Sequence, residues 1–418
     1  MSVPPVPHAD HDRAAPRPRS PWLTVGICFL VAVLEGFDIQ ALGVAAPRLA
    51  PELSLDPAQM GWLFAIGSIG ILFGAAIGGR AADRIGRKPV FATSVAIFGA
   101  FTVAMTGTKS FEGLLVLRGI AGLGFGAALP NMMAVAIDIA PTSRRAFTAA
   151  AMFCGLPLGG AAAALVTQLL PPDADWRVIF YMGGVLPLLL VPAILFYMNE
   201  TYRPVVRDGA RERPPALLHS LLGEYRATST LLIWVVLLPT MLMLYLLLNW
   251  LPTLVSEQGL PRSVAPLAAM FFNLGGAMGG LMLAPLVDRF GFRWPVTFAF
   301  TALFAVLVAL ATASSTLAIL ALSGLGGFLL LGANYAFYGV AAAYYPAHIR
   351  GTGSGAAVAV GRFGSVVGPL FAGLLMGQGR AVSDILSWLA PCAAIAALAV
   401  LALSFVRSSS VTGAAENR

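Results

Sequence analysis

Charged residues are scarce in this chain: of its 418 residues, only 11% are Asp, Glu, Lys or Arg. Soluble domains average about 25% charged residues, so the composition excludes an ordinary soluble protein. Hydrophobic residues make up 58% of the chain and the mean hydropathy is +0.83, which predicts several membrane spans. The chain also lacks a Walker loop, a zinc-ligand pattern and a nucleophile motif. We therefore expect neither an ATP-driven pump nor an enzyme, and no cofactor.

Cysteine is equally scarce. The three cysteines, Cys28, Cys154 and Cys392, each lie inside an apolar run. None has the spacing of metal ligands, and none lies in a loop where a disulfide could form. We expect them to pack as small apolar side chains, and we predict no metal site.

Long apolar runs are what the chain has in abundance. Twelve runs of about 20 residues are separated by polar or Pro- and Gly-containing segments, which is typical of transmembrane helices. The predicted spans are 22–46, 60–80, 89–108, 113–137, 146–170, 178–198, 230–255, 264–286, 295–313, 317–343, 352–376 and 384–406. The predicted fold class is an all-α integral membrane protein.

The polar stretch 199–229 contains five arginines and divides six spans from six. A solvated linker is the expected reading, and a binding surface is the alternative. The predicted organisation is a disordered cytoplasmic tail at 1–20, a six-helix bundle at 21–198, a central cytoplasmic loop at 199–229, a second bundle at 230–406 and a cytoplasmic tail at 407–418. A signal peptide is not expected, because the first apolar run is too long and contains acids.

The basic residues are unevenly distributed. The net charge is +7, and with a cytoplasmic N-terminus nineteen of the 26 Lys and Arg lie on the cytoplasmic side, five lie outside and two lie within spans. The positive-inside rule then places both termini in the cytoplasm. The excess of positive charge is explained by topology and needs no nucleic-acid partner. We expect a monomer in the inner (plasma) membrane.

One segment occurs twice. Residues 83–88 read Asp-Arg-Ile-Gly-Arg-Lys and residues 288–293 read Asp-Arg-Phe-Gly-Phe-Arg, each after the second span of its half. Two six-helix halves in parallel repeat are an architecture of secondary transporters, whose binding site lies between the halves near the midplane.

Two acids stand out in the first span. Glu35 and Asp38 are three residues apart, so they share one face of a helix. A carboxylate at membrane depth is costly and is by default a functional candidate. We expect both acids to accept protons rather than to bind an anionic substrate, because like charges repel.

Segment 79–88 is a tight basic turn with one acid, which could latch two helices through charge-assisted bonds and helix-end dipoles. The alternative is that its cations only fix the topology. The predicted gating residues are Gly79, Asp83, Arg84, Gly86, Arg87, Asp138, Asp288 and Arg350. Asp138 is equally compatible with a plain interfacial charge, and Ala284 replaces the leading glycine in the second copy of the segment.

Two arginines lie inside predicted spans. Arg362 is about ten residues from the inner end of its span, too deep to snorkel fully, so it should face a polar cavity or an acid. A guanidinium binds carboxylate bidentately, and we predict that Arg362 clamps a substrate carboxylate. Arg118 precedes Gly122 and Gly126, a face suited to close helix packing. It is a second candidate substrate contact, with snorkelling to the outer interface as the alternative.

Amide and aromatic side chains within the spans could line the same pocket. The predicted substrate-binding residues are Arg118, Arg362, Gln40, Asn131, Asn249, Asn334 and Tyr338. Each amide or tyrosine taken alone is more often a packing residue.

These motifs cover nearly the whole chain and together resemble the major facilitator superfamily, whose second-loop signature is matched by 79–88. Within it, Glu-Gly-Phe-Asp at 35–38 resembles the Asp-Gly-x-Asp signature of aromatic acid–proton symporters. Segments 34–41, 129–131 and 357–362 are most similar to the 3-(3-hydroxyphenyl)propionate transporters.

The resemblance implies functional acids at Glu35 and Asp38. It implies functional basic residues at Arg118, Arg350 and Arg362. Two departures bear on substrate or proton affinity: Glu35 replaces the more usual Asp, and Arg293 stands where some relatives carry His.

The predicted function is import of a small aromatic carboxylate, resembling hydroxyphenylpropionate or benzoate, by proton symport through alternating access. The expected partners are that carboxylate, protons and the lipid bilayer. A drug–proton exporter is the alternative, permitted by a partial exporter-like motif at 155–160. A sensor on the same fold is a third reading and would need an added signalling domain.

Overall fold

The computed structural model describes residues 21–141, 144–171, 174–198, 200, 221–223, 226–346 and 349–406. The predicted tails at 1–20 and 407–418, and most of the predicted central loop, lie outside these described residues.

Within the described chain, twelve helices are long and apolar enough to cross a membrane. They are α1 (Pro21–Glu52), α2 (Pro57–Ile85), α3 (Arg87–Met105), α4 (Phe111–Ile139), α5 (Arg145–Leu169), α6 (Arg177–Tyr197), α8 (Ala227–Ser256), α9 (Val264–Phe290), α10 (Arg293–Thr312), α11 (Thr316–Ala343), α12 (Arg350–Gly377) and α13 (Val382–Leu403). A helix satisfies its own backbone hydrogen bonds, which lipid cannot do. The all-α fold with twelve membrane helices is as predicted.

Several helices are longer than the predicted spans. α1 continues past residue 46 to Glu52, through Pro47 and Pro51, and α9 continues to Phe290. Hydropathy marks only the part of a helix that lies in lipid, whereas the helix itself continues into the polar boundary.

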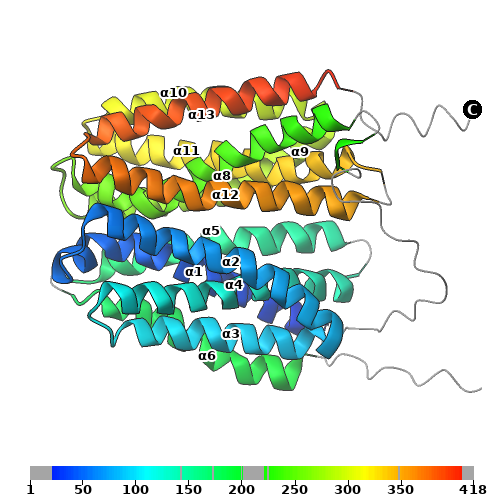
Figure 1. The fold of residues 1–418 in the computed structure, drawn as a ribbon, viewed down its shortest axis with the longest axis horizontal. Helices are drawn as coiled ribbons and strands as arrows, with labels where there is room; N and C mark the ends of the chain where they lie inside the picture. The colour runs from blue at the N-terminus through cyan, green and yellow to red at the C-terminus, as the bar shows by residue number, and fades with distance from the viewer. Residues whose placement is uncertain are drawn as a thin grey trace, which may run out of the picture.

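The helices form two groups that lie side by side in Figure 1: α1 to α6 below, and α8 to α13 above. We call these groups the N half and the C half. Glycines bring neighbouring helices into backbone contact within each half. A Cβ on Gly126 of α4 would lie 2.1 Å from the carbonyl oxygen of Ile71, and one on Gly122 would lie 2.5 Å from that of Gly67. The predicted small-residue face of the fourth span is therefore confirmed as the α2–α4 contact.

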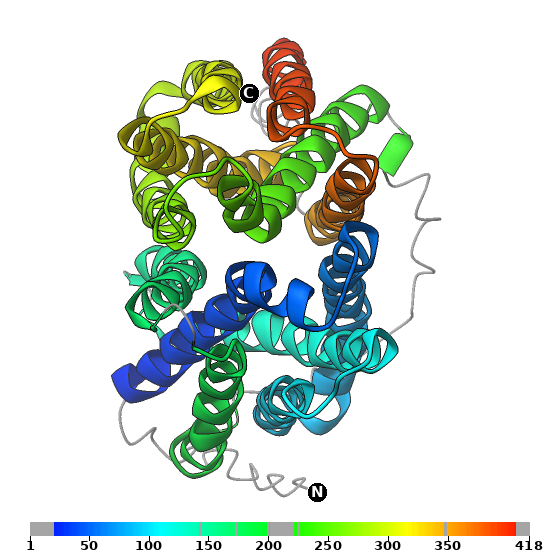
Figure 2. The same cartoon turned by 90° about the vertical axis from the view of Figure 1, so that its left-hand side faces the viewer.

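The bundle has two ends. We call the end where α1 begins and α13 ends the terminal end, and the opposite one, towards the viewer in Figure 2, the far end. Near the far end the two halves approach closely. A Cβ on Gly61 of α2 would lie 3.4 Å from Cα of Gly373 on α12, and the rings of Phe64 and Trp250 meet edge to face at 5.2 Å. Towards the terminal end, at the right of Figure 1, α2 diverges from α12.

The two copies of the repeated segment form the same turn. Gly86 joins α2 to α3 at φ 97°, and Gly291 joins α9 to α10 at φ 75°. Only glycine adopts this region readily, so the glycine of each copy is required by the turn itself.

Candidate functional site

The two acids of α1 are both buried inside the bundle. Glu35 is 2% exposed and Asp38 is fully buried. Gly36, between them, lets α5 pack directly onto this stretch, because a Cβ there would lie 1.9 Å from the carbonyl oxygen of Leu156. Local packing therefore removes both carboxylates from lipid.

Asp38 is held by Arg118 of α4. The Arg118 Nη1 donates to Asp38 Oδ2 at 2.6 Å, and Nη2 lies 3.4 Å from the Asp38 carbonyl oxygen. Arg118 is only 5% exposed, so it lies inside the bundle and does not snorkel to an interface. Glycines make room for the pair: Cβ atoms on Gly67 and Gly183 would lie 3.2 Å from Arg118 Nε and Asp38 Oδ1. Breaking such a buried pair by removing one partner costs about 3–5 kcal/mol.

Glu35 faces a different cation. Arg362 of α12, in the C half, is the positive charge that acts most strongly on the Glu35 carboxylate. The Arg362 Nη1 donates to the Tyr245 hydroxyl of α8 at 2.6 Å, and its guanidinium carbon lies 5.8 Å from the centre of that ring. Glu35 Oε2 is buried without a hydrogen-bond partner. The structure thus sets an incompletely satisfied acid of one half opposite a cation of the other.

Aromatic side chains gather around Arg362. The Tyr335 and Tyr338 side chains of α11 lie close to Tyr245 and, for Tyr338, to Arg362 itself. Across the boundary between the halves, the ring of Phe153 on α5 lies 5.6 Å from that of Tyr335. All four rings and Arg362 are only half-buried although they lie inside long helices. A cation surrounded by partly accessible rings suits a ligand with one negative charge and an aromatic body.

The predicted amides fall into two places. Gln40 bridges the halves, since its Nε2 donates to the Leu248 carbonyl at 2.7 Å and its Oε1 accepts from Asn273 Nδ2 at 3.1 Å. Asn249 and Asn131 donate to carbonyls of their own helices, at 2.6 Å and 2.7 Å. Asn334 lies beside Tyr338. The structure therefore brings Tyr338 to Arg362, with Asn334 beside Tyr338, and places Gln40 in a seal between the halves.

Three rings of this site, those of Tyr245, Tyr335 and Phe153, were not among the predicted substrate contacts. Phe153 precedes the glycine- and proline-containing stretch of the fifth span, and Tyr335 is three residues before Tyr338 on the same face of α11. That spacing is the signal by which Tyr335 could have been found. For Phe153 the sequence offers none, because its partner is 182 residues away along the chain.

The sequence matches the profile of the Major Facilitator Superfamily over residues 28–279 and 256–417. The chain belongs to the major facilitator superfamily. It is 39% identical over 92% of its length to a 3-(3-hydroxy-phenyl)propionate transporter of Escherichia coli (strain K12), covering 94% of that protein. It is 31% identical over 95% of its length to the 4-hydroxybenzoate transporter PcaK of Acinetobacter baylyi, covering 94% of that protein.

Among solved structures, the fold matches a bacterial homologue of the human lysosomal transporter Spinster, in an inward-facing and unoccupied conformation. The TM-score is 0.72 at 17% identity, over 92% of this chain and 97% of the other. The chain is therefore a multi-pass membrane transporter of the major facilitator superfamily and not an enzyme. Its relatives named for aromatic acids do not favour the drug-exporter alternative.

The superfamily's second-loop signature forms a charged cluster at the terminal end. Arg87 pairs with Asp138 of α4. Glu200, just beyond α6, accepts the backbone N–H groups of Arg87 and Lys88 at 3.0 Å and 3.1 Å, which caps the positive N-terminus of α3. The prediction missed Glu200, because the sequence placed it in the central loop.

Four other predicted gating residues lie away from this cluster or at the surface. Gly79 would have open space around an added Cβ, and Arg84 is exposed at the end of α2. In the C half, Asp288 and Arg350 are exposed as well. Their gating role stays a prediction.

Proposed function

We propose that this transporter imports a small aromatic carboxylate together with protons by alternating access. Its site lies between the halves, at Arg362 and Glu35. It acts as a monomer in the inner membrane, with both termini in the cytoplasm. The named relatives support the substrate class, and the nineteen-to-five distribution of basic residues supports the orientation.

The observation that carries the proposal is that aromatic rings surround the guanidinium of Arg362. A guanidinium binds a carboxylate through two parallel hydrogen bonds, and the neighbouring rings of Tyr245, Tyr335 and Tyr338 supply an apolar surface with polar edges. An aromatic acid has a carboxylate for the guanidinium and a ring for the aromatic surface. Arg362 is thus the group that binds the anion.

Glu35 supplies the link to protons. While Glu35 is ionised it is a counter-ion of Arg362, so an incoming carboxylate would meet its negative charge. A proton on Glu35 removes that charge and leaves Arg362 for the substrate. The order of binding is therefore proton first and acid second.

Asp38 has a separate task. Because its carboxylate is committed to Arg118, the pair holds α1 and α4 together within the N half. Protonation of Asp38 would release Arg118 and loosen this half. We propose that protonation of Asp38 is a second proton-dependent step, after that of Glu35. Arg118 is then the counter-ion of Asp38 and does not contact the substrate.

In the proposed orientation the far end faces the outside. The Gln40 bridge and the glycine contacts between the halves then close the outer path. Rocking of the halves about the central site would open the far end and close the terminal end, where the cluster around Arg87 lies.

The test is uptake of labelled 3-(3-hydroxyphenyl)propionate into proteoliposomes with and without an imposed proton gradient. Uptake should depend on the gradient and fall at least tenfold in Arg362→Ala, a loss of about 1.4 kcal/mol or more. A matched control is Arg380→Ala, because Arg380 is exposed at the far end and remote from the site. Uptake that is indifferent to both the gradient and Arg362→Ala would contradict the proposal.

A further inference from the structure

A cavity lined by polar groups that the proposed function does not involve lies at the far end, between the two halves. It has a volume of about 490 Å³ and is lined by segments of α1, α5, α8, α9 and the α8–α9 connection. Its charged lining residues are Arg48 of α1 and Arg262 of the connection. This cavity is separate from the site around Arg362.

The floor of this cavity is the seal that closes the central site. Val44, which lines the cavity, follows Gly43, whose added Cβ would lie 2.9 Å from the Asn249 carbonyl oxygen. Pro252 lines it one turn beyond Asn249, and Ala265 lines it two turns before Asn273. The cavity therefore lies directly on the far side of the Gln40 bridge, on the path that an outside substrate must take.

The charged residues that line the cavity are all positive. Its described lining residues include two arginines and no Asp or Glu. Arg48 Nη1 and Gln168 Oε1 are buried there without hydrogen-bond partners. The acid one turn along α1, Glu52, is occupied elsewhere, by Arg177 and Trp176 at 2.8 Å each. Of these two atoms Arg48 Nη1 is the donor; a buried donor without an acceptor is costly, and a small anion would satisfy it.

We propose that this cavity is an anion-binding vestibule, in which Arg48 and Arg262 capture the substrate carboxylate from outside before it reaches Arg362. The inference rests on the proposed function. Clefts lined by charge of one sign raise the local concentration of an oppositely charged ligand and its association rate. The vestibule should therefore raise the association rate of the substrate and leave the rate of the transport step unchanged.

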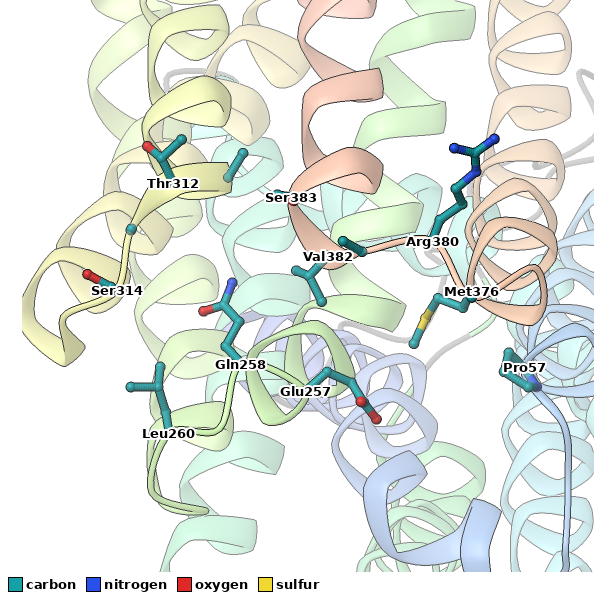
Figure 3. A pocket seen from close by; sticks show the side chains of 14 residues that line it. Pro57, Glu257, Gln258, Leu260, Thr312, Ser314, Met376, Arg380, Val382 and Ser383 are labelled. Atoms are coloured by element: carbon teal, nitrogen blue, oxygen red, sulfur yellow. The ribbon is translucent and has the colours of Figure 1, made fainter.

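The larger far-end cavity provides a contrast within the same molecule. It has a volume of about 670 Å³ and carries both Arg380 and Glu257, whose side chains point apart in Figure 3. Its lining comes from the C half apart from Pro57, and none of its residues takes part in the Gln40 bridge. Arg380 is thus a far-end arginine that lies off the proposed path, which makes it the matched control.

The experiment measures the concentration dependence of initial uptake of labelled 3-(3-hydroxyphenyl)propionate in cells. In Arg48→Gln/Arg262→Gln, KM should rise about tenfold while Vmax stays within about twofold. The tenfold rise is the low end of the range by which electrostatic focusing raises association rates. Arg380→Gln should change neither constant. An unchanged KM in the double variant, or an equal rise in Arg380→Gln, overturns the vestibule.

A charge-preserving variant separates electrostatics from packing. Arg48→Lys/Arg262→Lys should keep the wild-type KM, and a rise equal to that of the glutamine variant would overturn the proposal. Raising salt from about 0.01 M to about 0.15 M should raise KM in the wild type but not in the glutamine variant, because the Debye length falls from about 30 Å to about 8 Å. If the wild type takes up no aromatic acid, the proposed function itself fails; if it does and the double variant keeps its KM, only the vestibule fails.

Discussion

At the scale of residues, the site divides its charges into two pairs with different accessibility. Asp38 and Arg118 lie within one half and are both buried, whereas Glu35 and Arg362 come from different halves and Arg362 stays half-exposed. A pair inside one rigid unit contributes to its integrity. A pair across the boundary between the halves can be broken by a ligand, so it suits the proposed coupling.

The first prediction concerns the buried pair. Asp38→Ala should leave Arg118 as an uncompensated buried charge and lower the free energy of unfolding by about 3–5 kcal/mol, seen as earlier thermal unfolding in detergent. Replacing both residues with leucine should restore much of the loss, because no charge is then left unpaired. If the single and double variants unfold alike, the pair does not hold the N half together.

The second prediction concerns the aromatic ring of the substrate. Phe153→Leu should keep carboxylate binding but reduce the preference for 3-phenylpropionate over 3-cyclohexylpropionate by about 2- to 10-fold, since aromatic pairs contribute about 0.5–1.5 kcal/mol beyond burial. Competition against labelled uptake measures the preference. The control is Phe98→Leu, whose ring stacks on Phe125 within the N half. An unaltered preference in Phe153→Leu would remove Phe153 from the site.

At the scale of elements, glycine contacts and caps fix how the helices meet. Glu200 caps α3 with two hydrogen bonds although it follows α6, so it ties the two helices together at the terminal end. The third prediction is that Glu200→Gln weakens this cap by about 0.3–1 kcal/mol, because it removes an anion from a helix N-terminus. Amide hydrogen exchange at Arg87 and Lys88 should accelerate severalfold, and Glu257→Gln should leave it unchanged.

The sequence predicted the helices well but did not predict which side chains contact one another. Apolar runs predicted all twelve helices, and the loop 79–88, the acids of α1 and Arg362 pointed to a transporter, because membrane burial makes such charges costly and therefore meaningful. The pairing of Asp38 with Arg118, the Phe153–Tyr335 contact and the role of Glu200 were not predicted. Each joins residues far apart in the chain, and single-sequence periodicity carries no information on such contacts.

At the scale of the whole molecule, the proposed alternating access requires a second conformation in which the far-end seal opens. Gly160 of α5 and Asn273 of α9 meet across the halves, since a Cβ on Gly160 would lie 2.7 Å from Asn273 Cγ. The fourth prediction is that Gly160→Cys/Asn273→Cys forms a disulfide under oxidation and stops uptake, with recovery on reduction. The single cysteine variants are the controls. Continued uptake by a fully cross-linked transporter would contradict alternating access through this end.

The central claim is that Arg362 takes the substrate carboxylate when a proton neutralises Glu35. Calorimetric titration of the purified transporter with 3-(3-hydroxyphenyl)propionate, in buffers of different ionisation enthalpy, counts the protons taken up on binding. We predict proton uptake in the wild type and in Asp38→Asn, and binding without proton uptake in Glu35→Gln. Undiminished proton uptake in Glu35→Gln would contradict the account.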